Sequence, residues 1–390
     1  MKIIKLLTVI ASAILMNSCN QNKSSKSDIA HQLIIPDSAT FGTWNLSNEK
    51  NILKFSDLFT DDFNVVKLET SIECLVSNIT DLILFNNRLL IFDAKQGSIL
   101  IFDKEGKYIN KIFPKGKGPL EINQITDYAI NHKKQSIDIF DFTKQKIISF
   151  DVEGNPLSEI EFPYYAREIA IDESGNYVVY SPDIINKYKT IEIPCGLFLV
   201  NEKAEFIRKY LAFPLPNAYV QPIKCLSGSG NEITLVSNYL PGVFEIKNGK
   251  VSELYEIQSP TDWLNSYTLS NSFGKRHLFL FSNKDGNTVT AFYDAKTGKT
   301  KTVLGLNNDL FLAPIFIPDK YISEQQMVST MTAQDIIQSF NSIKNSNHSD
   351  LVKHFGSKAL DKYKELSNSI LNNSNEDDNP IIFTFNLKNE

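Results

Sequence analysis

One sequence pattern occurs twice between Ile91 and Pro163, and this repeat restricts the fold more than any other feature of the chain. The first copy reads IFDAKQGSILIFDKEGKYINKIFP and the second reads IFDFTKQKIISFDVEGNPLSEIEFP. Four pairs of positions share the same offset of 48 residues: Asp93 and Asp141, Asp103 and Asp151, Gly106 and Gly154, Ile112 and Ile160. A period of about 40–50 residues filled with short strands is typical of β-propeller blades. The repeat therefore predicts an all-β propeller.

Each copy predicts a blade of four strands. The first blade spans Ile79 to Pro114, and the second spans Ile125 to Pro163. Asn and Gly stand between the strands, where tight hairpins need positive φ. The predicted strands of the first blade are Asp81–Phe85, Arg88–Asp93, Ser98–Asp103 and Tyr108–Phe113. The four repeated aspartates lie near strand ends in both copies, which favours a structural role in turns.

The later blades diverge from these copies. Strands of a third blade are expected at 169–180, 197–200 and 206–213, with an insertion at 184–194. Strands of a fourth are expected at 220–226, 232–237, 243–246 and 253–257, and of a fifth at 277–282, 288–294 and 299–304. A sixth blade would begin at 311–317, end at 381–387 and be completed by the early strand 63–68, since such closure removes exposed sheet edges. Residues 31–56 have no clear periodicity and are expected to be irregular.

A helical segment interrupts the last blade between Thr332 and Asn372. Apolar residues recur there at helical spacing, and Thr332 with Asp335 resembles a capping box. Gly356 and the cluster 345–349 divide the segment into shorter helices. It is expected to be either an amphipathic hairpin packed on the side of the propeller or a lid or docking surface.

The N-terminus resembles the leader of a bacterial lipoprotein. Lys2 and Lys5 precede the apolar run Leu6–Met16, which is too short for a stable transmembrane helix. A small residue, Ser18, stands directly before Cys19, as in a lipobox. We therefore expect a signal peptide over residues 1–18 and a lipid on Cys19. The alternative is an ordinary secretory leader in which Cys19 carries no lipid.

Residues 19–32 then form a polar tether in front of the propeller, which is expected to occupy residues 33–390. Several acyl chains on one cysteine make stable membrane anchoring plausible. Position 20 is Asn rather than the aspartate associated with inner-membrane retention, and no acidic run for surface export follows. These features favour the outer membrane, with the domain facing the periplasm.

The overall charge and the cysteines exclude several classes of function. The formal net charge of −5 gives no basic excess, so nucleic acid is not an expected partner. Cys74, Cys195 and Cys225 have no C-x-x-C spacing, which argues against a zinc site or a redox motif. We expect them to be buried thiols rather than a disulfide framework.

Several motifs together resemble the six-bladed, NHL-like β-propeller lipoproteins of Bacteroidetes. They are LETS at Leu68–Ser71, the paired IFD strands, the segment Lys115–Glu121 and Asn379–Ile382. In that family the central segment usually reads G-x-G-P-G-E, whereas Leu120 stands here in place of the last glycine. The resemblance covers about residues 33–388 and implies six blades, but it implies little about activity.

The segment Lys115–Glu121 connects the first predicted blade to the second. Gly116, Gly118 and Pro119 suit a tight turn in which Glu121 caps neighbouring amides. Because such connectors lie on one face of the disk, the alternative is that Lys115, Lys117 and Glu121 line a ligand-binding mouth of the channel. These three residues are the candidate ligand contacts.

No catalytic motif accompanies these candidates. The five histidines include no H-x-H or H-E-x-x-H pair, and the sequence has no G-x-S-x-G elbow or P-loop. We therefore expect no catalytic residues, no protein metal site and no cofactor, although a structural or channel Ca²⁺ is left open.

Two functions follow. The first is a membrane-anchored, noncatalytic binding or scaffolding protein that recognises a glycan, peptide or envelope protein. The second is a hydrolase or lyase that depends on a divalent metal in the propeller channel.

Overall fold

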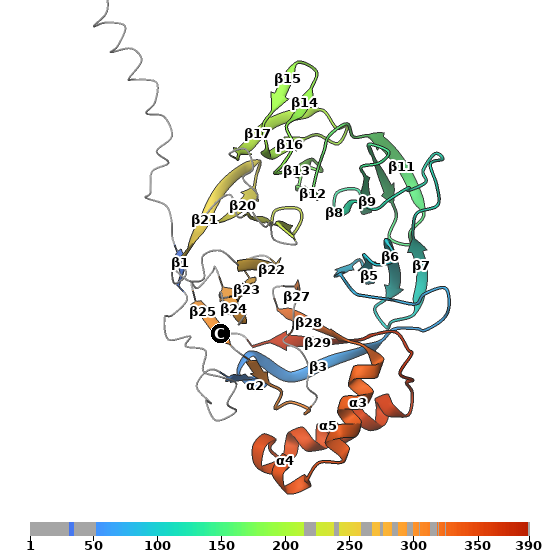
Figure 1. The fold of residues 1–390 in the computed structure, drawn as a ribbon, viewed down its shortest axis with the longest axis vertical. Coiled ribbons are helices and arrows are strands. Elements are labelled where there is room, and N and C mark those ends of the chain that lie inside the picture. The colour runs from blue at the N-terminus through green and yellow to red at the C-terminus, as the bar shows by residue number, and fades with distance from the viewer. Residues whose placement is uncertain are drawn as a thin grey trace, which may run out of the picture.

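The computed structural model describes residues 31–34, 52–213, 224–237, 242–258, 267–273, 276–282, 288–294, 299–303, 305–312, 318, 320–323 and 325–388. The expected signal peptide, Cys19 and the tether up to residue 30 lie outside the described residues. The described strands form sheets arranged around a common axis, with a helical segment on one side (Figure 1). The prediction of an all-β propeller is confirmed.

The two repeat copies form two four-stranded antiparallel sheets with the strands in chain order. The first contains β4 (Asp81–Phe85), β5 (Arg88–Asp93), β6 (Ser98–Asp103) and β7 (Tyr108–Ile112). The second contains β8 (Asp127–Asn131), β9 (Ser136–Asp141), β10 (Lys146–Phe150) and β11 (Pro156–Glu161). These bounds agree with the predicted strands of the first blade, except that β7 ends one residue earlier.

The repeated aspartates serve the turns, as predicted. The buried carboxylate of Asp93 accepts backbone N–H groups from Ser77 and Gln96, and thereby joins the segment before β4 to the β5–β6 turn. Asp141 does the same with Asn123 and Lys144. Asp103 and Asp151 instead accept N–H groups two and four residues ahead in the following hairpin: Glu105 and Lys107, and Glu153 and Asn155.

An extra hairpin is inserted between two strands of the third sheet. The four strands of the sheet are β12 (Glu168–Ile171), β13 (Tyr177–Ser181), β16 (Gly196–Val200) and β17 (Phe206–Ala212). The predicted insertion forms a separate antiparallel pair, β14 (Asn186–Tyr188) and β15 (Ile191–Ile193), which lies beyond the sheet in Figure 1.

The next two sheets correct the expectation that residues 31–56 are irregular. The fourth sheet contains β18 (Leu226–Ser227), β19 (Ile233–Val236), β20 (Gly242–Lys247) and β21 (Lys250–Gln258), and β1 (His31–Ile34) adds to β21 in parallel. The fifth contains β22 (Tyr267–Phe273), β23 (Arg276–Ser282), β24 (Thr288–Asp294) and β25 (Lys299–Val303). Nearby, β2 (Ile52–Lys54) pairs in parallel with β26 (Gly305–Asn307), and α2 (Phe55–Leu58) follows β2. Strands as short as β1 and β2 show no hydrophobic period in the sequence. They form because they pair with strands that are distant in the chain.

The last sheet joins the two ends of the domain. It is ordered β27 (Lys320–Ser323), β28 (Gln326–Met331), β29 (Ile381–Leu387) and β3 (Phe59–Lys67). Closure by an early strand is confirmed. The expectation that this sheet begins at Phe311–Ile317 is wrong for the described part, because Phe311 lies in a turn and packs in the core; residues 313–317 lie outside the described residues.

Three helices stand between β28 and β29, as the helical spacing predicted: α3 (Ala333–Lys344), α4 (His348–Phe355) and α5 (Ser357–Leu371). Thr332 caps α3, where its hydroxyl accepts the Asp335 N–H at 3.1 Å. Ile336, Phe340 and Leu360 are buried in one cluster with Phe383 of β29, so the helices pack on the side of the last sheet (Figure 1). Among the described residues, no helix combines the length and apolar character needed to cross a membrane.

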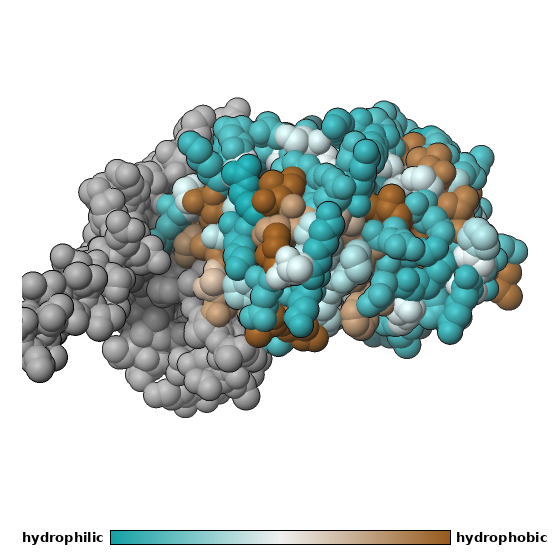
Figure 2. Space-filling model, turned by 90° about the horizontal axis from the view of Figure 1, so that it is seen from above, coloured by the Kyte–Doolittle hydropathy of each residue, from teal (hydrophilic) through white to brown (hydrophobic). Residues whose placement is uncertain are grey.

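The three described cysteines, Cys74, Cys195 and Cys225, are buried free thiols, as expected. Viewed from above, the described surface is mostly hydrophilic and carries separate hydrophobic patches (Figure 2).

Candidate functional site

Charged side chains gather where the innermost strands of the propeller begin. These first strands contact one another in the order β8, β12, β18, β22, β27 and β4, and a hydrogen bond between Tyr128 and Asp81 links β4 back to β8. We call six residues on these strands, or within two residues before them, the axial cluster: Asp81, Asp127, Tyr128, Glu168, Lys224 and Lys320. Strands β8, β12, β22 and β27 surround the axis of the fold in Figure 1.

Asp81, the first residue of β4, is the centre of the axial cluster. One carboxylate oxygen lies 2.7 Å from the ammonium of Lys320, on the neighbouring strand β27. The other lies 2.9 Å from the ammonium of Lys224 and accepts the hydroxyl of Tyr128 at 2.7 Å. Since β18 contacts β12 and β22 rather than β4, the ion pair with Lys224 crosses the axis.

Asp127 and Glu168 occupy the same position as Asp81, at the start of β8 and β12. Each accepts backbone N–H groups from the next part of the ring. Asp127 accepts the N–H of Ile169 at 2.7 Å. Glu168 accepts those of Cys225 at 2.9 Å and Leu226 at 2.7 Å. These bonds join neighbouring sheets at the axis.

The surroundings of these groups shift their pKa values in opposite directions. Burial alone would raise the pKa of Asp81, but Lys224, Lys320 and the Tyr128 hydroxyl hold it far below its usual range. Burial raises the pKa of Asp127 to about 7; Lys224 opposes this shift and Glu168 adds to it. Burial also raises the pKa of Glu168, despite its backbone donors. Burial would lower the pKa of Lys224, yet the carboxylates, Asp81 first, keep it above its ordinary value.

Asp127 therefore makes stability depend on pH near neutrality. A carboxyl whose pKa is higher in the folded state than in the unfolded state costs stability as the pH rises from about 4 to about 7. We expect Asp127→Asn to remove this cost and to stabilise the protein by about 2 kcal/mol at pH 8, with little effect at pH 4. Urea unfolding at both pH values measures the difference. Equal effects at the two pH values would contradict an Asp127 that titrates near 7.

No three His, Cys, Asp or Glu side chains of the described residues are grouped so that they could share a metal ion. Each carboxylate of the axial cluster has hydrogen-bond partners within the chain.

The sequence-based candidates lie elsewhere. Lys115 and Lys117 are exposed, and Lys115 lies over the ring of Phe113 at 5.3 Å. Glu121 bends back over its own loop, where its carboxylate accepts the Gly118 N–H at 2.8 Å. The described contacts of this loop are with the outer part of the second sheet, through Lys144 and Glu159. The predicted cap is confirmed, and the ligand contact stays a prediction.

Leu120 stands where the family pattern has its last glycine, and its own backbone has a positive φ, which favours glycine. Its φ is 56°, a region that costs an ordinary residue about 1–2 kcal/mol. We expect Leu120→Gly to stabilise the protein by up to about 1 kcal/mol, because the lower backbone strain outweighs the added freedom of the unfolded chain. Leu120→Ala is the control: it removes the same side chain and keeps the strain, so it should not stabilise. Thermal unfolding distinguishes the two.

Two other motifs of the sequence meet at the closure. The buried side chain of Asn379 donates to the carbonyl oxygens of Glu69 at 2.6 Å and Cys74 at 2.8 Å, and accepts the Val76 N–H at 2.8 Å. The N–H of Asn379 donates to Thr70 at 2.9 Å. LETS and the Asn-Pro motif therefore bind each other through hydrogen bonds and join the early and late parts of the chain. We call this contact between residues 69–76 and Asn379 the latch.

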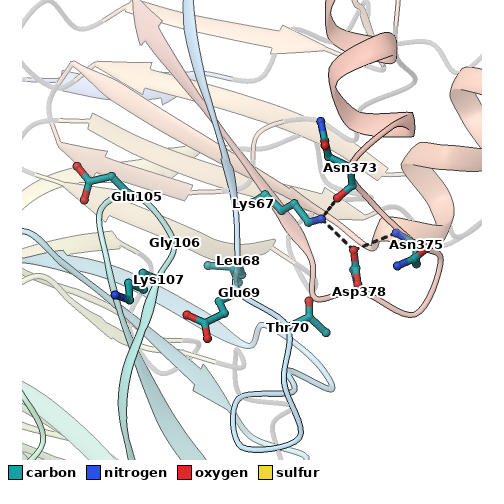
Figure 3. Close-up of a pocket in the computed structure, with 10 residues that line it drawn as sticks. All are labelled: Lys67, Leu68, Glu69, Thr70, Glu105, Gly106, Lys107, Asn373, Asn375 and Asp378. Carbon is teal, nitrogen blue, oxygen red and sulfur yellow. Dashed lines mark hydrogen bonds and ion pairs between the residues drawn. The ribbon is translucent and has the colours of Figure 1, made fainter.

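An open pocket of about 440 Å³ lies beside this latch (Figure 3). It is formed by the end of β3, the β6–β7 turn and the segment after α5. Within it, Lys67 forms an ion pair with Asp378 at 3.0 Å and donates to the carbonyl of Asn373. The lining is mainly polar. The ion pair and the hydrogen bond of Lys67 connect the end of β3 to the segment after α5.

Sequence reasoning missed the axial cluster. One signal was present, because three successive first strands begin with an acidic residue: Asp81, Asp127 and Glu168. Lys224 and Lys320 carried no comparable signal, since they come from the parts of the chain where the repeats diverge.

Comparison with solved structures supports the fold. A predicted exported protein from Bacteroides fragilis NCTC 9343 is similar with a TM-score of 0.66 and 16% sequence identity, over 87% of this chain and 99% of that one. A member of the DUF4221 family from Bacteroides vulgatus is similar with a TM-score of 0.46 and 10% identity, over 85% of this chain and 98% of that one. At 16% identity, the similarity to the Bacteroides fragilis protein concerns the fold alone.

No curated protein matches the sequence. One family model does, and it covers residues 41–386, which is most of the chain. The description of that family is "Domain of unknown function (DUF4934)". The chain belongs to this family, and it folds as a β-propeller.

Proposed function

We propose that this protein is a membrane-anchored, noncatalytic binding or scaffolding component of the cell envelope. The observation that carries the proposal is the bonding of the axial cluster. Asp81 is held by two lysines and a tyrosine, and Asp127 and Glu168 are held by backbone N–H groups at the start of the next sheet. Such bonding makes a rigid platform with fixed charges, which suits recognition by complementarity.

The anchor in this proposal is a lipid on Cys19, in the outer membrane and facing the periplasm. The lipobox-like sequence before Cys19 supports it. The similar protein from Bacteroides fragilis is named as exported, which supports a place in the envelope. Lys115, Lys117 and Glu121 stay candidate ligand contacts, on a loop separate from the axial cluster.

The proposal includes six NHL-like blades. Five regular four-stranded sheets are accompanied by the sheet β18–β21, which carries β1 as a fifth strand. We count that sheet as a blade, because its first strand β18 contacts β12 and β22. The family resemblance of the sequence supports the same number.

Two measurements on the full chain test the proposal. Labelled palmitate should enter the wild-type protein and should be absent from Cys19→Ser, which should also leave the membrane fraction. The purified protein should hold no stoichiometric metal, and EDTA should leave its Tm unchanged. A bound divalent metal whose removal lowers the Tm strongly would contradict the noncatalytic function and support the hydrolase or lyase alternative.

A further inference from the structure

Lys224 differs from the other cation of the axial cluster. Both lysines bind Asp81, but the side chain of Lys320 is 14% exposed, whereas that of Lys224 is 42% exposed. Lys320 also donates to the carbonyl of Thr80 at 3.0 Å, which fixes it to the strand that carries Asp81. Lys224 thus reaches Asp81 from the more open side and is the cation that another group can replace.

The groups that receive the Lys224 ammonium form a site of defined chemistry. Its nitrogen lies 2.9 Å from the Asp81 carboxylate and 5.7 Å from the centre of the Tyr128 ring. Asp127 and Glu168 also attract its charge. A carboxylate beside an aromatic face is a common way for proteins to bind an organic ammonium group. Asp81 keeps its position without Lys224, because Lys320 and Tyr128 hold it independently.

The charges around this site favour a cation when Lys224 is absent. Asp81 would then keep its ion pair with Lys320, and Arg167 would still attract Glu168. Because Lys224 opposes the rise that burial causes in the pKa of Asp127 and of Glu168, its absence leaves both carboxyls without that stabilisation. An incoming ammonium group would supply the same attraction as Lys224 does.

We propose that the axial cluster is a recognition site for a primary ammonium group, that Lys224 occupies it as a tethered substitute, and that its external ligand is the lysine side chain of a peptide or protein. This inference rests on the proposed binding function and specifies the chemistry of the ligand. The ligand displaces Lys224 and takes over its contacts with Asp81 and Tyr128.

Removal of the tethered ammonium tests the proposal directly. Lys224→Met keeps a flexible apolar chain of similar length and lacks the charge. The probe is Nα-acetyl-lysine N-methylamide, and the matched control probe is the norleucine analogue, which has no ammonium group. By calorimetric titration we expect the lysine probe to bind Lys224→Met at least tenfold more tightly than it binds the wild type. Lys224→Met combined with Asp81→Asn should lose this gain, and the norleucine probe should bind neither variant.

A second measurement uses the wild-type protein and does not depend on the folding of a variant. Displacement frees the Lys224 amine, so the lysine probe should increase acetylation of Lys224 by a water-soluble reagent at least twofold, as measured by peptide mass spectrometry. The norleucine analogue should leave the rate unchanged. An unchanged rate with both probes, or equal binding of both probes to Lys224→Met, would overturn the ammonium site.

These outcomes are separable from failure of the proposed function. A metal-free protein that carries lipid on Cys19 and ignores the lysine probe has lost only the proposed ligand class. A protein with a stoichiometric metal, or without lipid, contradicts the proposed function whatever the probe does.

Discussion

Gly106→Ala is expected to destabilise the protein by about 3 kcal/mol, because an added Cβ collides with the closing strand. It would strike the carbonyl oxygen of Lys67 and lie 2.9 Å from Cγ1 of Val66, both on β3. The φ of Gly106 is 89°, so a side chain at this position also strains the backbone. In addition, the N–H of Glu69 donates to the Gly106 carbonyl at 2.7 Å, and this bond would be displaced. Urea unfolding of both proteins measures the change.

Gly97→Ala is the matched control. Gly97 also has a positive φ, 62°, but an added Cβ would meet no atom within 4 Å. This variant should therefore be destabilised only by backbone strain, by about 1 kcal/mol. If both variants lost the same amount, the close contact between the β6–β7 turn and β3 would not contribute to closure of the propeller.

Asp81→Asn is expected to destabilise the protein by about 2–3 kcal/mol at pH 7. The variant leaves Lys224 and Lys320 without a carboxylate between them, and an uncompensated, partly buried charge is costly. The estimate is below that for a fully buried pair, because Lys224 remains open to solvent. Chemical unfolding at pH 7 measures the loss.

The effect of Asp81→Asn also has a defined pH dependence. The pKa of Asp81 is lower in the folded protein than in the unfolded chain, so its contribution is present above about pH 4 and is lost as the pH falls further. The difference between wild type and variant should therefore shrink in acid.

Asp361→Asn provides the control for a surface ion pair. Asp361 lies 3.5 Å from Lys364 on the exposed side of α5, and its loss should cost less than about 0.5 kcal/mol. A similar loss for Asp81→Asn would mean that the axial cluster does not hold the sheets together.

The first two sheets were the most predictable part of the protein. Their strands and turns were readable because alternating apolar residues, Asn and Gly turns and the 48-residue offset agree with one another. The roles of Asp93 and Asp141 followed from their recurrence, since a residue that repeats from blade to blade performs the same local task in each. The helical segment was also predictable, because its apolar period is local.

Features that depend on distant partners were not predictable. β1 and β2 are short and gain their identity by parallel pairing with β21 and β26. The start of the last sheet was misplaced because Phe311 is apolar for a different reason: it packs among Phe63, Phe383 and Phe385. Apolar character alone does not distinguish a strand from a buried turn.

The sequence by itself determined that the chain is an all-β propeller with a helical insertion and an early strand that closes the last sheet, because these properties follow from local periodicity and internal repetition. Only the tertiary structure decided which charged side chains form ion pairs at the axis. Lys224 and Asp81 are far apart in the chain, and their ion pair exists because curvature of the ring of sheets brings β4 opposite the segment before β18. No pattern within either segment specifies that distance.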